Sequence, residues 1–144
     1  MYRGLILILF LGVATSGCNP RWDKLVSMQM PGTSVQGMEK IYVKKLDTDT
    51  KNINLLIKAE LLKKGYEATT EEDGPKPNNV DGVLVYYDRW YWLLEPFLFH
   101  LTIFIENPEE DLVLVAGKSI RMAGAERDFP IIKNVLDLLL DDKP

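Results

Sequence analysis

The sequence is short of the residues from which most metal centres and many active sites are built. Its 144 residues include one cysteine, Cys18, and one histidine, His100. A single cysteine excludes a disulfide within the chain and a cysteine-based metal site, and a single histidine disfavours histidine-rich metal centres. No glycine-rich phosphate-binding loop occurs in the sequence. We therefore expect no cofactor and no metal ion, and we expect that the protein is not an enzyme.

Long basic blocks are also missing. The chain has 17 Lys and Arg against 21 Asp and Glu, a net charge of −4, and a pI near 5.0. Nucleic-acid-binding domains concentrate positive charge on one face, so this balance disfavours a nucleic-acid partner. The hydrophobic content of 47% and charged content of 26% are ordinary for a globular protein, and the length fits a single domain.

The first residues follow the three-part plan of a secretory signal peptide. Arg3 precedes an apolar run from Leu5 to Leu11, and small residues continue to Gly17. The uncharged stretch is 14 residues long, whereas a membrane-spanning helix needs about 20. We therefore predict a cleaved signal peptide over residues 1–17.

The end of this segment, Thr15-Ser16-Gly17-Cys18, resembles the lipobox of bacterial lipoproteins, in which small residues precede an invariant cysteine. The resemblance implies cleavage before Cys18 and attachment of lipid to that cysteine. Thr15 departs from the Leu, Val or Ile that the family prefers there, and the alternative is a conventional signal peptide that leaves Cys18 as a free thiol. Asn19, rather than Asp, follows the cysteine, which in this family implies the outer membrane and its periplasmic face.

Residues 19–37 show little periodicity and contain breaks at Pro20, Pro31-Gly32 and Gly37. We interpret residues 18–37 as the lipidated cysteine and a tether, and residues 38–144 as a single periplasmic domain. In that domain Lys40–Leu46 alternates as a strand does. A helix is predicted next, with candidate N-caps in residues 47–50, an end at Gly65, and an apolar stripe of Ile53, Leu56, Ile57 and Leu61. Residues 66–70 predict a second strand, joined to the first by a parallel crossover.

Three runs rich in β-branched and aromatic residues follow a polar loop over residues 71–79. They span 80–92, 97–105 and 112–122, separated by Pro96 and by the turn-forming residues 107–111. This composition and punctuation predict a three-stranded antiparallel meander. Residues 128–140 predict a closing helix, with an apolar stripe of Ile132, Val135, Leu136 and Leu139. The fold class is therefore α+β in two layers: a mixed five-stranded sheet, element order β-α-β-β-β-β-α, with both helices on one face.

The meander also carries the candidate binding face. In the middle strand, alternation predicts that Phe97, Phe99, Leu101, Ile103 and Ile105 face the core. The remaining face is too aromatic for a plain solvated surface, and we assign to it Tyr86, Trp90, Trp92, Leu98, His100 and Phe104. Three interpretations stay open: coverage by the tether and the edge strands, contact with copies or a protein partner, and a platform for lipid, glycan or peptide at residues 90–92.

Catalysis at His100 would require a nucleophile beside it, and Thr102 and Ser119 are the nearest candidates along the strands. Neither lies in a recognisable nucleophile motif. The acidic residues 71–73 lack the ligand spacing of a calcium loop, so we interpret them as a solvated loop.

Beyond the lipobox, the chain resembles the small α/β lipoproteins of Gram-negative envelopes. The strand–helix–strand start also looks similar, in topology alone, to lipoproteins of curli and exopolysaccharide secretion and to activators of cell-wall synthases. We therefore predict a non-enzymatic, membrane-anchored protein that binds envelope proteins or copies of itself. The alternative is a periplasmic carrier or sensor that binds a hydrophobic or glycan ligand at the aromatic face.

Overall fold

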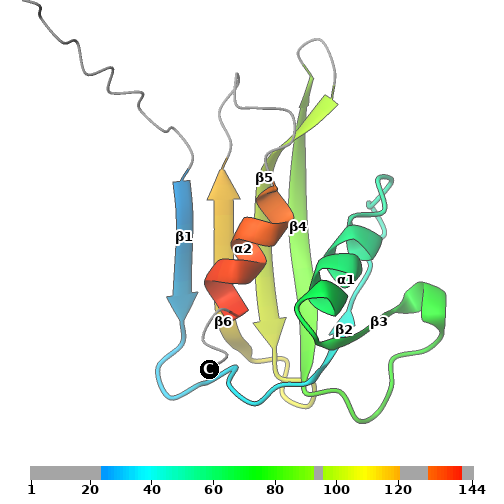
Figure 1. Cartoon of the computed structure of the whole chain (residues 1–144), viewed down its shortest axis with the longest axis vertical. Helices are drawn as coiled ribbons and strands as arrows, with labels where there is room; N and C mark the ends of the chain where they lie inside the picture. The colour runs from blue at the N-terminus through cyan, green and yellow to red at the C-terminus, as the bar shows by residue number, and fades with distance from the viewer. Residues whose placement is uncertain (1–23, 93–95, 121–129, 141–144) are drawn as a thin grey trace, which may run out of the picture.

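The structure is a computed structural model that describes residues 24–92, 96–120 and 130–140. These residues form one mixed six-stranded sheet with two α-helices on the same face (Figure 1). The strands are β1 (Lys24–Gln29), β2 (Lys40–Val43), β3 (Glu67–Thr70), β4 (Gly82–Trp92), β5 (Pro96–Glu106) and β6 (Val113–Ile120), and the helices are α1 (Ile53–Lys63) and α2 (Ile131–Leu140). The sheet order is β1-β6-β5-β4-β2-β3.

The α+β class is as predicted, but the number of strands and the element order are not. The predicted tether contains an additional strand, β1, which pairs antiparallel with β6 at the edge of the sheet. All six residues of β1 are exposed. A strand at the edge of a sheet is formed by backbone hydrogen bonds to its one neighbour, so it can form even where none of its side chains is buried. Residues 24–29 of the predicted tether are therefore part of the sheet.

The predicted strand–helix–strand unit is present as β2-α1-β3, and β2 and β3 are parallel. Helix α1 ends as predicted, with Gly65 in the left-handed region at φ 85°. Its apolar stripe differs from the prediction. Ile53, Ile57 and Leu61 are buried together with Asn54, whereas Leu56 is 51% exposed.

The meander β4-β5-β6 forms the antiparallel half of the sheet. Its core face is fully buried beneath the helices and includes Leu84, Tyr86, Leu101, Ile103 and Ile105. Because paired residues of neighbouring strands lie on the same face, the register Tyr86–Ile103 and Leu84–Ile105 joins these side chains into one layer.

Helix α2 completes the core with Ile132, Val135, Leu136 and Leu139, the four residues of its predicted stripe. It packs against β6, where Gly117 permits a close approach. A Cβ atom at Gly117 would lie 2.8 Å from two carbons of Leu139, so any larger residue would push the helix from the sheet.

Candidate interaction surface

The face of the sheet that carries no helix is the candidate functional surface. Register places Met28, Ala116, Phe104 and Val85 in one row across β1, β6, β5 and β4. The next row holds Val26, Lys118, Thr102 and Tyr87, and a third holds Lys24, Ile120, His100 and Arg89. We call this side the open face.

The open face carries large apolar side chains in solvent. Val26 is 56% exposed, Met28 59% and Tyr87 58%. The ring of Tyr87 meets that of Phe104 edge to face, with 5.8 Å between centroids. We define Val26, Met28, Tyr87, Phe104 and Ala116 as the open-face patch. Contiguous exposed apolar groups of this kind usually mark a contact surface.

On the side of the sheet near β2, the side chains of the open face bury one another. Tyr42, Val80, Val83 and Val85 form a second, smaller cluster of buried side chains. Burial is the main cause that raises the pKa of Tyr42, and the nearby carboxylates of Glu71 and Glu72 act in the same direction. The open-face patch is therefore confined to β1, β6, β5 and β4.

Basic groups surround the patch. Lys118 lies beside Val26 and Thr102 in the second row, next to the patch residues, and Lys24 and Arg89 lie in the row with His100. Partial burial of the imidazole lowers the pKa of His100, and the positive charges of Lys118 and Arg89 lower it further. The histidine is therefore neutral near pH 7, and the surface is apolar with a basic margin.

The residues assigned by sequence to one binding face do not lie together. Tyr86 and Leu98 belong to the buried core, and Trp90 packs against it. His100 and Phe104 are half-buried on the open face, and Trp92 is 71% exposed at the end of β4. This part of the prediction is wrong.

Two features of the register explain the error. The prediction combined residues of β4 and β5 without knowing which of them lie opposite each other. Tyr86 is paired with Ile103 and therefore faces the core. A bulge between Arg89 and Trp90 then leaves Phe99 without an opposite residue, and it reverses the alternation of β5. As a result Phe97 and Phe99 leave the predicted core face and contact Tyr91, at centroid distances of 5.9 and 6.2 Å.

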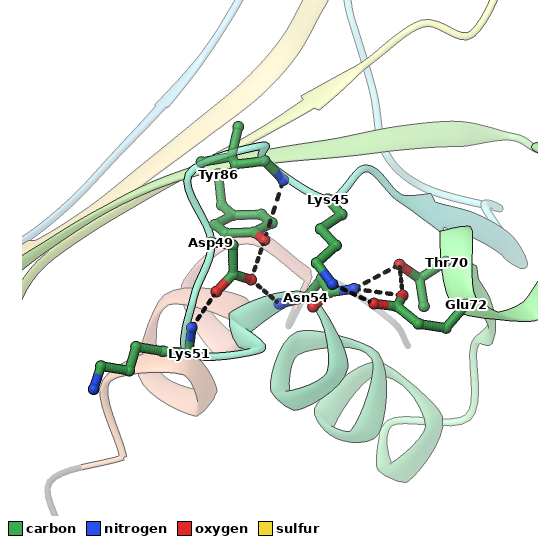
Figure 2. A network of polar contacts seen from close by, with 8 residues as sticks. Lys45, Asp49, Lys51, Asn54, Thr70, Glu72 and Tyr86 are labelled. Carbon is green, nitrogen blue, oxygen red and sulfur yellow. Dashed lines mark hydrogen bonds and ion pairs between the residues drawn. The ribbon is translucent and has the colours of Figure 1, made fainter.

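A buried polar network holds the covered face in place (Figure 2). The hydroxyl of Tyr86 donates to Asp49 Oδ2 at 2.6 Å, and the backbone N–H groups of Lys51 and Asn54 donate to the same carboxylate. Burial alone would raise the pKa of Asp49, but these hydrogen bonds outweigh it and hold the pKa below its ordinary value. Burial and the same bond raise the pKa of Tyr86. Asp49, one of the predicted cap residues, thus anchors the start of α1.

The network continues from α1 to the short helix η1 (Glu71–Asp73) through Asn54. The Nδ2 atom of Asn54 donates to Thr70 Oγ1 at 3.0 Å and to Glu72 Oε2 at 2.7 Å. Lys45 pairs with Glu72 at 2.7 Å, and Lys58 pairs with Asp73 at 2.6 Å. Glu72 and Asp73 are therefore paired with lysines, and among the described ranges no group of His, Cys, Asp and Glu is arranged to hold a metal ion.

Of the two candidate nucleophiles, one lies beside His100. Thr102 Oγ1 is 2.9 Å from His100 Nε2, as expected for alternate residues on one face of a strand. Ser119 is buried in the core face, opposite Leu101. In catalytic triads a carboxylate stabilises the imidazolium, whereas here Lys118 and Arg89 disfavour it. The arrangement gives no support for a general base, and the absence of enzymatic activity stays a prediction.

Cys18 lies outside the residues that the structure describes. Within the described part of the chain, neither helix has the length and hydropathy required to span a bilayer.

Comparison with solved structures identifies the fold in other proteins. The chain is similar to a PelC dodecamer from Paraburkholderia phytofirmans, with a TM-score of 0.58 and 14% identity over 81% of this chain and 97% of that one. A PDZ domain protein from Parabacteroides distasonis matches with a TM-score of 0.50 and 11% identity, over 81% of this chain and 35% of that one. At these identities the likeness concerns the fold alone.

No protein-family model matches the chain, and no curated protein sequence matches it significantly.

Proposed function

We propose that this protein is a non-enzymatic lipoprotein that is anchored at Cys18 to the periplasmic face of the outer membrane and associates with copies of itself through the open face of its sheet. The observation that carries the self-association is the open-face patch, in which Val26, Met28 and Tyr87 are each more than half exposed. Burying such groups against another subunit removes apolar area from water, worth about 25 cal/mol per Å².

A second apolar surface lies on the opposite side of the molecule. Leu55 and Leu62 are 38% and 50% exposed, and at 100° per residue they lie on the side of α1 away from the buried Ile57. Two different surfaces that meet head to tail generate a ring when the rotation closes. The assembly of the structurally similar PelC as a dodecamer supports self-association.

The anchor rests on the sequence Thr15-Ser16-Gly17-Cys18 and the apolar run before it. Several acyl chains on one cysteine would hold the protein firmly, because each buried methylene contributes about 0.8 kcal/mol. The test compares the wild type with Cys18→Ala by fractionation of cells. Release of the variant from membranes is expected, and unchanged retention would contradict the anchor.

Self-association is tested by native mass spectrometry of the full-length chain in detergent. Met28→Lys should abolish the assembly, because it places a charge in the patch. Leu112→Lys is the matched control, since Leu112 is 46% exposed but lies in the turn before β6, outside the patch. An assembly that survives Met28→Lys would overturn the proposed interface.

A mixing experiment separates a head-to-tail contact from a symmetric one. Met28→Lys leaves the helix surface intact, and Leu62→Lys leaves the open face intact. In a head-to-tail assembly each variant alone is monomeric, and an equimolar mixture forms heterodimers because one good pair of surfaces remains. In a symmetric assembly through the open face, Leu62→Lys assembles as the wild type does.

A further inference from the structure

The β4–β5 hairpin extends beyond the described residues of β1 and β6. Lys24, Ile120, His100 and Arg89 form the last row that crosses four strands. Among the residues that the structure describes, β4 and β5 alone continue past that row, and β4 runs three residues further to Trp92. At about 3.3 Å per residue, this ribbon projects roughly 10 Å. We call its described residues, 90–92 and 96–99, the hairpin tip.

The hairpin tip is rich in aromatic residues, two of which are exposed. Trp92 is 71% and Tyr91 52% exposed. The rings of Phe97 and Phe99 are half-buried and pack on Tyr91. Aromatic residues with one polar atom, such as Trp and Tyr, are the residues that concentrate where a membrane meets water, since one end is apolar and the other is hydrated.

The base of the ribbon is braced. Trp90 packs against the core, its Nε1 donates to Asp88 Oδ2 at 2.7 Å, and the ammonium of Lys51 lies 5.7 Å from the centre of its ring. The hairpin tip is therefore presented in a fixed direction.

The hairpin tip lies at the end of the sheet where the chain enters β1 (Figure 1). Cys18 precedes Lys24, the first residue of β1, by six residues, which reach at most roughly 20 Å when fully extended. A lipid on Cys18 would thus hold this end of the molecule within that distance of the bilayer, and the hairpin tip projects on the same side.

The charged side chains at the two ends of the sheet favour the same orientation of the molecule. Lys24, Arg89 and Lys51 flank the hairpin tip, with the carboxylate of Asp88 beside Trp90. The turn at the opposite end of β5 and β6 carries Glu109, Glu110 and Asp111. Basic side chains near an anionic bilayer surface are attracted and carboxylates repelled, so this distribution favours the hairpin tip facing the lipid.

We propose that the hairpin tip inserts into the headgroup region of the membrane to which the protein is anchored, with Trp92 and Tyr91 as the contacting side chains. The proposal rests on the lipid anchor at Cys18, because one acyl anchor and one protein contact together fix the orientation of the domain. Insertion stops at the interface, where water still satisfies the backbone groups of a two-stranded ribbon.

The test uses the lipidated full-length chain in vesicles of phosphatidylethanolamine and phosphatidylglycerol, some of the lipids carrying brominated acyl chains. Fluorescence is compared between Trp22→Phe and the double variant Trp22→Phe/Trp92→Phe, so that the difference reports Trp92 alone. We expect bromolipid to quench Trp92 and expect shielding from aqueous iodide. Leu112→Trp in the double variant is the control at the opposite end, and its emission should be quenched by iodide only.

Each other outcome overturns the inference in a distinct way. If the chain floats with the vesicles but iodide alone quenches Trp92, the anchor stands and the hairpin tip does not touch lipid. Protection of Trp92 from both quenchers would mean that protein covers the hairpin tip instead. A chain that does not float with the vesicles would overturn the anchor, and the membrane contact with it.

Discussion

The two faces of the sheet are built from similar side chains and differ in what covers them. On β4, Tyr86 is fully buried while its neighbour Tyr87 is 58% exposed. On β5, Ile103 is fully buried while Phe104 is only partly covered. The difference arises because α1 and α2 lie on one face only. Alternation places Leu101, Ile103 and Ile105 of β5 correctly in the core, but on β4, where both faces carry tyrosine, it does not show which face the helices cover.

The polar groups of the two faces also differ. On the covered face, the hydroxyl of Tyr86 is bonded to a carboxylate that accepts several backbone N–H groups. On the open face, His100 lies among the cations Lys118 and Arg89, and Thr102 is its hydrogen-bonding neighbour. The first arrangement stabilises the fold, whereas the second leaves charge available at a surface.

The largest expected difference between the faces is in the free energy of unfolding that is lost when a side chain is replaced by alanine. Ile103→Ala removes a fully buried side chain and should lower the free energy of unfolding by about 2–5 kcal/mol. Met28→Ala removes the same number of heavy atoms from a side chain that is 59% exposed, and away from buried features such changes stay within about 0.5 kcal/mol. Urea denaturation of dilute protein measures both.

Protein concentration sharpens this comparison. If copies cover the open face, the cost of Met28→Ala should rise with concentration, because association stabilises the folded state by mass action. The cost of Ile103→Ala should not. Equal costs for the two variants in dilute protein would mean that the open face is packed within the monomer.

Much of the fold could be predicted from the sequence, because its signals are local. The meander, the parallel β2-α1-β3 unit and the stripe of α2 follow from periodicity, turn residues and a glycine after α1. Strand β1 could not be predicted in this way. Its residues are exposed, and it is formed by backbone pairing with β6, more than 80 residues away along the chain.

The candidate surface was harder to predict for the same reason. His100 and Phe104 were assigned to it correctly, but Tyr86 and Leu98 were assigned against their observed burial. Faces of separate strands can be combined only when the register is known, and a bulge at Phe99 reverses the pattern in β5. Val26 and Met28 were missed because a two-residue alternation on an unrecognised strand carries no signal.

A smaller effect is expected from the polar network beneath the covered face. Tyr86→Phe removes the hydroxyl that donates to Asp49 and should lower the free energy of unfolding by about 2 kcal/mol, as for other hydrogen bonds to charged groups. Tyr42→Phe is the matched control, because it removes the same atom from a buried tyrosine that does not contact Asp49. A larger loss in the control would show that the network contributes little.

The pH dependence of this loss has a defined sign. Because the pKa of Asp49 is lowered in the folded state, its contribution is complete above the ordinary carboxyl pKa of about 3.9 and is lost as the pH falls through the folded value. Without the Tyr86 hydroxyl the folded pKa rises, so acid unfolding should begin at a higher pH. Circular dichroism during acid titration measures this shift.

The smallest expected effect comes from the open face, and it tests directly whether that face is free. Partial burial and the cations Lys118 and Arg89 lower the pKa of His100, so the unfolded chain binds more protons and stability falls as the pH drops below about 6.5. His100 is the single histidine of the chain, so its proton NMR signal reports this pKa without ambiguity. Lys118→Gln should raise the pKa, because it removes one cation.

Association through the open face would bury the ring further, and the pKa should then fall with protein concentration in the wild type but not in Met28→Lys. A pKa that is the same at all concentrations would place His100 outside any contact between copies.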